Sequence, residues 1–411
     1  MSLYQLERDG DVQELIRLLR ESDNPEIRQR AAGLLGGFDD HDDRRDVVNA
    51  LTEAAETDDV DAVTAAAVDS LEELGGDAIE QLIASMAGID FEDGADWVKA
   101  EAFTRALGSD VPELRMAAAN GLGQFGDSDA LPKLIEAFED ADYRVRARAA
   151  RAAGSIGDPR ACDPLEGLLA DRSPAVRREA AEALGGISNR QALQALLEMY
   201  DDSDERVRRI AVGAFGNFDN GSPVEHLVEA LSDESAAVRR TAVYSLIELL
   251  SNVPTDRSHQ IRESIVEELS ATEDATVVVP LVEILEESTQ TAQRRNTAWL
   301  LGRVTDGDHE RVIDALISCL DDDDQMTSQF AATSLAEFDG DVVEDALIDV
   351  VENDDRDRDS RAQAIFTLGK VGGERSREAL ESLIDDTDDE KIRKRAFSAL
   401  SKLGGQAGDV L

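Results

Sequence analysis

Apolar residues recur along this chain at the spacing that puts them on one face of an α-helix. In one well-formed stretch, Leu165 and Leu168 belong to a first apolar stripe, and Val176, Ala180 and Leu184 form a second. Residues spaced by three or four positions lie on the same side of a helix. A short polar turn that contains a proline separates the two stripes. The stretch therefore predicts two amphipathic helices in succession.

This two-helix pattern repeats along the chain. The second helix opens on Val-Arg or a close variant, has Ala four residues after the Val-type position, and ends near Leu-Gly. Five copies follow one another at intervals of 31 residues, from Leu114, Val145, Val176, Val207 and Val238, and looser copies begin at Ile27, Val63, Gln293, Thr327, Ser360 and Ile392. Self-similarity at such a period is the signature of a repeat solenoid, whose units pack only on their neighbours. We expect an extended surface and no single enclosed pocket.

Two features predict where the second helix of each copy begins and ends. Asp, Ser or Thr stands five residues before every Val-type position, at 22, 58, 109, 140, 171, 202, 233, 288, 322, 355 and 387. Such side chains favour the N-cap, because their oxygens accept hydrogen bonds from the first-turn amides. A glycine follows the last apolar position at 36, 123, 154, 185, 216, 302 and 369, which predicts a left-handed C-cap.

Two stretches break the period. Residues 86–108 predict an extra helix through Trp97 and Phe103, and residues 251–272 predict another through Ile261. Because each repeat touches only its neighbours, an inserted helix changes the local superhelical rotation, so we expect bends near residues 90 and 255. The expected organisation is a single solenoid over 1–411, with N-terminal repeats in 1–85, an inserted helix in 86–108, regular repeats in 109–250, an inserted helix in 251–272 and C-terminal repeats in 273–411.

The repeat resembles the HEAT repeat, in particular the short subtype of the phycobilin lyases. This resemblance covers about residues 12–403 and implies an all-α, right-handed α-solenoid (superhelix) of about eleven HEAT-like helix pairs with two inserted helices. It also implies that the second helix of each pair lines the concave side. The arginines after the Val-type positions resemble a ladder that bonds acidic groups of adjacent repeats, at 28, 115, 146, 177, 208, 239, 294, 361 and 393. Thr64 and Ser328 depart from this pattern, so we expect the ladder to be broken there.

Charge refines this picture. The net charge is −47, only six residues are lysine, and aromatic residues make up 4% of the chain. An acidic, lysine-poor surface on a folded chain resembles the proteins of salt-accumulating haloarchaea. No apolar run reaches the length of a membrane span, and the first residues do not form a signal peptide. We therefore expect a cytoplasmic, halophilic archaeal protein that acts as a monomer.

Catalytic and metal-binding patterns are weak. The single His-Glu dyad is His309-Glu310, and the acidic runs 306–308 and 321–324 do not follow the order of an EF-hand loop. Cys162 and Cys319 are too few for a disulfide framework. Nucleic acid binding requires a clustered basic face, which the net charge disfavours. We expect no cofactor, no metal, no nucleic acid and no catalysis.

One face concentrates the rare residue types. The positions two, three and six after the Val-type residue should face the concave side, and they carry Arg148, Arg151, Arg178, Arg209, Arg240, Tyr244, Arg295, Trp299, Phe330 and Phe366. Two interpretations remain open. The arginines pair with acids such as Glu179 or Glu182 while the aromatics fill seams between helices, or the row forms a protein-binding groove, since arginine and aromatic residues often anchor interfaces.

These observations favour a non-catalytic scaffold or adapter that binds partner proteins along its concave face. HEAT proteins of this kind resemble products found beside taxis and archaellum genes in haloarchaea, which implies a role in taxis signalling. The alternative is a phycobilin-lyase-like enzyme or enzyme subunit that acts on a tetrapyrrole. A HEAT-type nucleic acid binder is a third, weaker interpretation.

Overall fold

A computed structural model of the protein describes residues 3–89, 96–253, 258–271, 274–305, 310–338 and 340–406. All regular elements within these ranges are helices, which confirms the all-α prediction. The α-helices are α1 (Leu3–Asp9), α2 (Val12–Glu21), α3 (Pro25–Leu35), α4 (Arg44–Thr57), α5 (Asp61–Leu74), α6 (Gly76–Ala87), α7 (Asp96–Ala106), α8 (Pro112–Phe125), α9 (Leu131–Glu136), α10 (Tyr143–Ile156), α11 (Cys162–Leu168), α12 (Pro174–Ile187), α13 (Arg190–Leu196), α14 (Glu205–Ala214), α15 (Val224–Ala230), α16 (Ala236–Asn252), α17 (Ser258–Ser270), α18 (Asp274–Glu287), α19 (Thr291–Val304), α20 (Glu310–Ser318), α21 (Gln325–Leu335), α22 (Asp341–Glu352), α23 (Arg358–Val371), α24 (Glu374–Asp386) and α25 (Glu390–Gln406). Short 3-10 helices are η1 (Ser128–Ala130), η2 (Ala137–Glu139), η3 (Pro159–Ala161), η4 (Phe215–Asn217) and η5 (Cys319–Asp321).

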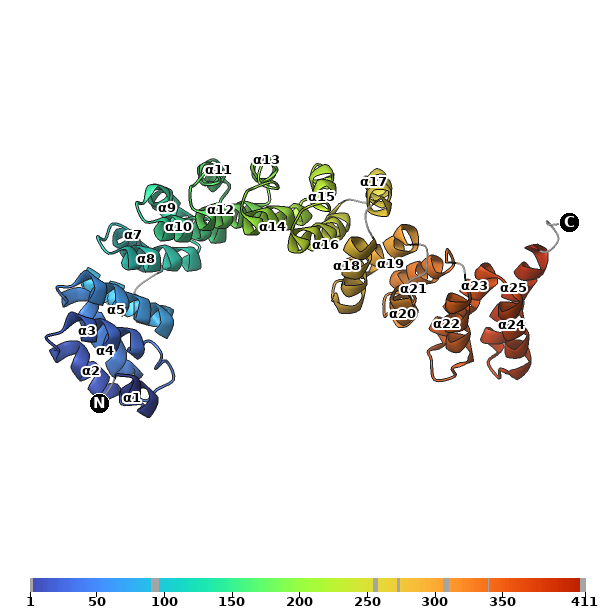
Figure 1. The fold of residues 1–411 in the computed structure, drawn as a ribbon, viewed down its shortest axis with the longest axis horizontal. Coiled ribbons are helices and arrows are strands. Elements are labelled where there is room, and N and C mark those ends of the chain that lie inside the picture. The colour runs from blue at the N-terminus through green and yellow to red at the C-terminus, as the bar shows by residue number, and fades with distance from the viewer. Residues whose placement is uncertain are drawn as a thin grey trace. The chain divides into compact units, whose positions relative to one another are not determined.

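The chain forms two compact units, Met1–Met199 and Tyr200–Leu411. In the first unit, helices α3, α5, α8, α10 and α12 stack side by side, and we call them the B layer of this unit. The remaining long helices pack against them as an A layer, and Figure 1 shows α9 and α11 on one side of α10 and α12. Consecutive A and B helices therefore form the two-helix repeats that the sequence predicts.

The second unit has the same construction. Its B layer consists of α14, α16, α19, α21, α23 and α25, and its A layer consists of α15, α18, α20, α22 and α24, while α17 packs against α15, α16 and α19. The two helices predicted in the breaks of the period are present as α7, in the first unit, and α17. The residues on which the bends were expected, 90–95 and 254–257, lie outside those that the structure describes.

The core consists of the repeated apolar positions. Val176, Ala180 and Leu184 are fully buried, and the equivalent positions of the other regular repeats are at most 3% exposed. Small and aliphatic side chains dominate, while Phe103 and Phe215 are among the few large aromatic side chains that are fully enclosed. Alanine at the middle position lets neighbouring B helices approach closely, so the low aromatic content is compatible with a well-packed core.

The predicted N-cap residues lie two positions too early. Helix α10 is capped by Asp142, whose carboxylate accepts from the Arg144 amide, and α14 is capped by Asp204. The predicted cap, Asp140, instead accepts from the backbone N–H of Asp142 at 2.9 Å and shapes the turn before the helix. The prediction was wrong because the turn carries cap-forming residues at both positions, so residue type alone does not fix the register.

The repeated glycine was also misassigned. Gly154 lies inside α10, and the left-handed residue that ends this helix is Gly157, at φ 70°. A Cβ at Gly154 would stand 2.6 Å from both Cα and Cβ of Ala183 on α12. The same closeness occurs where Gly302 faces Ser334. These glycines therefore allow adjacent B helices to touch, and they do not cap helices.

Candidate protein-binding face

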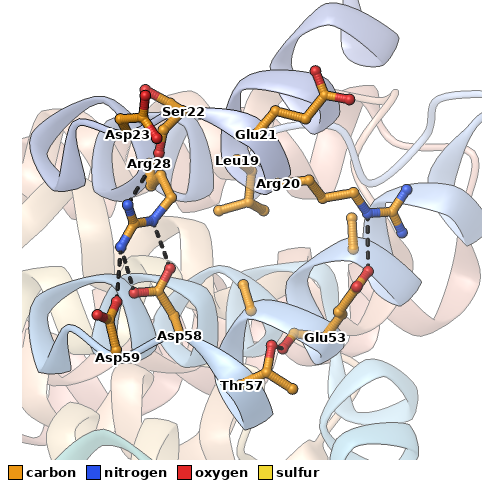
Figure 2. A pocket seen from close by; sticks show the side chains of 12 residues that line it. Leu19, Arg20, Glu21, Ser22, Asp23, Arg28, Glu53, Thr57, Asp58 and Asp59 are labelled. Carbon is orange, nitrogen blue, oxygen red and sulfur yellow. Dashed lines mark hydrogen bonds and ion pairs between the residues drawn. The ribbon is translucent and has the colours of Figure 1, made fainter.

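The arginine that follows the Val-type residue joins neighbouring repeats. In Figure 2, Arg28 of α3 donates to both oxygens of Asp58, at 2.7 and 2.9 Å. Its remaining nitrogen donates to the carbonyl of Ser22 at 3.0 Å. The same two-oxygen pairing, with distances of 2.7–3.1 Å, joins Arg115 to Asp140, Arg146 to Asp171, Arg208 to Asp233 and Arg294 to Asp322. The ladder implied by the HEAT resemblance is confirmed at these steps.

The lowered pKa of a ladder carboxyl agrees with a structural role for the ladder. Burial opposes ionisation of Asp140, but hydrogen bonds from Arg115 and from the Asp142 amide outweigh it and lower the pKa of the carboxyl. The hydroxyl of Ser328, which replaces a ladder arginine, donates to Gln325 within its own helix. The ladder step is therefore missing there, as predicted. Because the ladder arginines are already neutralised, they offer little to a ligand.

In the first unit, the predicted binding residues lie on the B layer and bond other polar side chains of that layer. Arg151 of α10 donates two hydrogen bonds of 2.8 Å to Glu179 of α12, and Arg178 donates to the same carboxylate at 3.0 Å. Glu179 is 3% exposed. Burial raises its pKa, but the two arginines outweigh this effect and lower the pKa overall. Arg148 reaches Asn120 at 3.5 Å. Arg151 and Arg178 therefore pair with a buried acid, and contact of these residues with a partner stays a prediction.

In the second unit, two predicted arginines are also paired. Arg240 contacts Glu283 at 2.6 Å, and the hydroxyl of Tyr244 lies 3.5 Å from the same carboxylate. Arg295 donates to both oxygens of Asp324, at 2.6 and 2.5 Å. Two further residues stand apart: Arg209 is exposed on α14, and Phe330 is half-buried on α21. Ion pairing therefore accounts for Arg240 and Arg295, whereas Arg209 and Phe330 remain available for contact with another molecule.

The predicted aromatic residues are flanked by cations. The guanidinium of Arg303 lies 4.5 Å from the ring centroid of Trp299, and that of Arg262 lies 5.4 Å from it. Lys370 and Lys402 lie 5.0 and 5.7 Å from the ring of Phe366.

Sequence reasoning missed these four cations, although two could have been found. Arg303 and Lys370 each follow their aromatic residue by four positions, the spacing of one helix face. Arg262 and Lys402 come from other helices, α17 and α25, so their approach depends on how the repeats stack. The first pair was therefore accessible from the sequence, and the second pair required the structure.

Charge is divided between the two layers of the second unit. In the A layer, α18 carries four acidic residues and α22 carries five, with no basic residue in either helix. In the B layer, α19 carries three arginines and no acid, and α25 carries five basic residues and one acid. A chain with a net charge of −47 thus has locally basic helices in one layer of this unit.

Other chemistry is not prominent in the described ranges. They contain no group of three or more His, Cys, Asp or Glu side chains placed to hold a metal ion. His309 and the run 306–308, considered as metal ligands from sequence, lie outside the described residues. None of the helices that the structure describes is long and apolar enough to cross a membrane.

Comparison with known proteins agrees with this architecture. The family described as HEAT repeats matches residues 12–108, 100–173, 165–248, 278–360 and 344–411. The chain belongs to the HEAT repeat family. A HEAT repeat-containing taxis protein of Halobacterium salinarum is 52% identical over 411 residues, which is 98% of this chain and 99% of that protein. The acidic, lysine-poor composition of these HEAT repeats thus has a halophilic archaeal homologue, as expected.

Two solved structures are similar to this HEAT repeat chain at low sequence identity. An engineered protein is 19% identical, with a TM-score of 0.44 and coverage of 96% of this chain and 99% of its own. A chain from a structure of Kap95p with RanGDP is 14% identical, with a TM-score of 0.49 and coverage of 97% of this chain and 63% of its own.

Proposed function

We propose that this HEAT repeat protein is a non-catalytic scaffold or adapter that binds partner proteins along the B-layer face. The observation that carries the proposal is the gathering of arginine and aromatic side chains there, in a chain with 89 acidic residues and 4% aromatic residues. Aromatic residues and arginine are enriched at interface cores and hot spots. The proposed contact row comprises Arg148, Arg151, Arg178, Arg209, Arg240, Tyr244, Arg295, Trp299, Phe330 and Phe366.

The process in which it acts is proposed from its relative. That protein of Halobacterium salinarum is named as a taxis protein and matches nearly the full length of both chains. We propose that the present protein acts as a monomeric, cytoplasmic adapter in archaeal taxis or archaellum signalling. Its 31-residue period supports assignment of the repeats to the short phycobilin-lyase-type subtype.

Partner binding should depend more on the aromatic residues than on the paired arginines. Replacing Trp299→Ala together with Tyr244→Ala should weaken capture of a partner roughly tenfold or more, since aromatic hot spots typically contribute about 2 kcal/mol or more. Arg178→Ala with Arg209→Ala should have a smaller effect, because at molar salt the Debye length is about 3 Å and charge acts only through direct contact. Arg178, moreover, is already bonded to Glu179.

The measurement is affinity capture from native cytosol at native salt, quantified by mass spectrometry. Trp97→Ala is the matched control, since Trp97 is 66% exposed on α7 and lies outside the proposed row. Circular dichroism at the same salt checks that each variant remains helical. A larger loss with the arginine pair than with the aromatic pair contradicts the ranking.

A further inference from the structure

Two arginines that have no ion pair among the described residues contact the ring of Trp299. Arg303, on the same helix, donates to the Trp299 carbonyl at 2.8 Å. Arg262, from α17, donates to the side-chain oxygen of Asn296 at 3.1 Å. No carboxylate of the described residues lies within ion-pairing distance of either guanidinium. We call these three side chains the Trp299 cluster.

Many other arginines of the described residues do contact a carboxylate. The chain has 89 acidic and 42 basic residues, and five ladder arginines, Arg28, Arg115, Arg146, Arg208 and Arg294, each contact one or more carboxylates. On α19 itself, Arg294 and Arg295 bond Asp322 and Asp324. An arginine in such surroundings would be expected to find an acid close by. The two cations of the Trp299 cluster are distinguished by lying over the same indole ring.

Burial adds a cost at Arg262, which is half-buried, whereas Arg303 is exposed. The Nε atom of Arg262 is inaccessible to solvent and has no hydrogen-bond acceptor among the described residues. Desolvation lowers the pKa of both arginines, and the charge of Glu337 only partly opposes this effect at Arg303. Partly desolvated charges without a counter-ion cost free energy. A bound anion would offset this cost.

The arrangement recurs further along the B layer. Phe366 of α23 has Lys370 four residues later and Lys402 of α25 beside its ring. The structure shows no ion pair for these two lysines within the described ranges, and both are exposed. Phe397, on α25, is 65% exposed. The second unit therefore has two aromatic B-layer positions at which cations gather that have no ion pair within the described ranges.

We propose that the Trp299 cluster binds an acidic segment of a partner protein, with Asp or Glu carboxylates held by Arg262 and Arg303 against the indole. This inference rests on the proposed scaffold function and assigns two residues and a partner chemistry to it. The chain itself shows how B-layer arginines hold carboxylates, since Arg295 takes both oxygens of Asp324 on an adjacent helix. The basic B-layer helices also reduce repulsion between an acidic partner and a chain of net charge −47.

The test uses a fluorescein-labelled octaglutamate peptide and the full chain in molar potassium chloride. Fluorescence anisotropy measures the affinity. The chain has two tryptophans, so Trp97→Phe leaves Trp299 as the one fluorescent indole. A change in its emission when the peptide is added shows that the peptide binds beside it. Arg262→Gln with Arg303→Gln should weaken binding at least tenfold. Arg311→Gln is the matched control, because Arg311 is exposed in the A layer and already paired with Glu286 at 2.9 Å. It should leave affinity within twofold.

Three results would overturn the assignment. They are an affinity for octaglutamine equal to that for octaglutamate, no effect of the double Arg→Gln change, and binding of a phosphoserine peptide with none of octaglutamate. Circular dichroism confirms that the variants fold.

A parallel capture from native cytosol distinguishes failure of the acidic-segment site from failure of the scaffold function. Equal capture of one partner by the wild-type and double-variant chains rejects the acidic-segment site and leaves the scaffold function standing, whereas no capture by either counts against the scaffold function itself.

Discussion

Replacing Arg208→Leu should lower the free energy of unfolding by about 3 kcal/mol, because it leaves a buried carboxylate without its partner. The side chains of Arg208 and Asp233 are only 8% and 10% exposed. Arg208 also donates to the Asp202 carbonyl at 2.9 Å. One side chain therefore joins the turn before α14 to the turn before α16. Its removal should therefore loosen α14 and α16 before more distant repeats, since each repeat contacts only its neighbours.

Two control variants separate the contribution of the buried Arg208–Asp233 ion pair from the general effect of removing a charge. Arg17→Leu removes an arginine that also contacts acids but is 53% exposed, and it should leave stability nearly unchanged. Asp233→Asn keeps a side-chain oxygen for the Ser235 amide while removing the charge. In the double variant with Arg208→Leu, the loss should be smaller than the sum of the single losses. Amide hydrogen exchange in α14 and α16 measures the effect, and an equal loss for Arg17→Leu and Arg208→Leu would rule out the explanation.

The second large effect is expected at Gly154, where Gly154→Ala should destabilise the first unit by about 1–3 kcal/mol. Alanine favours a helix over glycine by about 1 kcal/mol, so helix propensity alone predicts the opposite sign. Overpacking should prevail because the added Cβ would lie 2.6 Å from Cα and Cβ of Ala183, and α10 and α12 would have to separate. Denaturant unfolding followed by circular dichroism measures the change.

Gly33→Ala provides the matched control. Gly33 also lies in a B-layer helix, α3, and nothing stands within 4 Å of a Cβ built there. This change should raise stability by up to about 1 kcal/mol. Stabilisation by both substitutions would show that the repeated glycine does not set the distance between B helices.

The helices and the stacking order could be predicted from sequence because they depend on a local period. Val176, Ala180 and Leu184 all lie on one helix face, and burying that face fixes which side meets the next repeat. The ladder arginine could be placed for the same reason, since its position within the repeat is constant. The fold class was accordingly predicted from the pattern together with its resemblance to HEAT repeats.

The details that sequence did not predict depend on contacts between repeats. Asp140 and Asp142 are both suited to an N-cap, and only the path of the turn decides which one caps α10. Gly154 resembles a helix-ending glycine until its distance to Ala183 is known. Arg262 is 37 positions from Trp299 in sequence, so no helical period relates the two residues.

The division of charge offers a physical basis for the proposed adapter. The acidic A-layer helices keep the surface strongly hydrated and negative, while the B layer of the second unit combines unpaired cations with aromatic rings. In the proposed function, such direct contacts would select the partner, because high salt screens long-range steering.

The most direct test of the central proposal, that partners bind the B-layer face, is site-specific photo-crosslinking at native salt. A benzophenone amino acid would replace either Phe330, in the B layer, or Val342, which is 55% exposed in the A layer of the same unit. We expect a partner protein to crosslink at position 330 and not at position 342. Crosslinking at position 342 alone would contradict the proposed binding face.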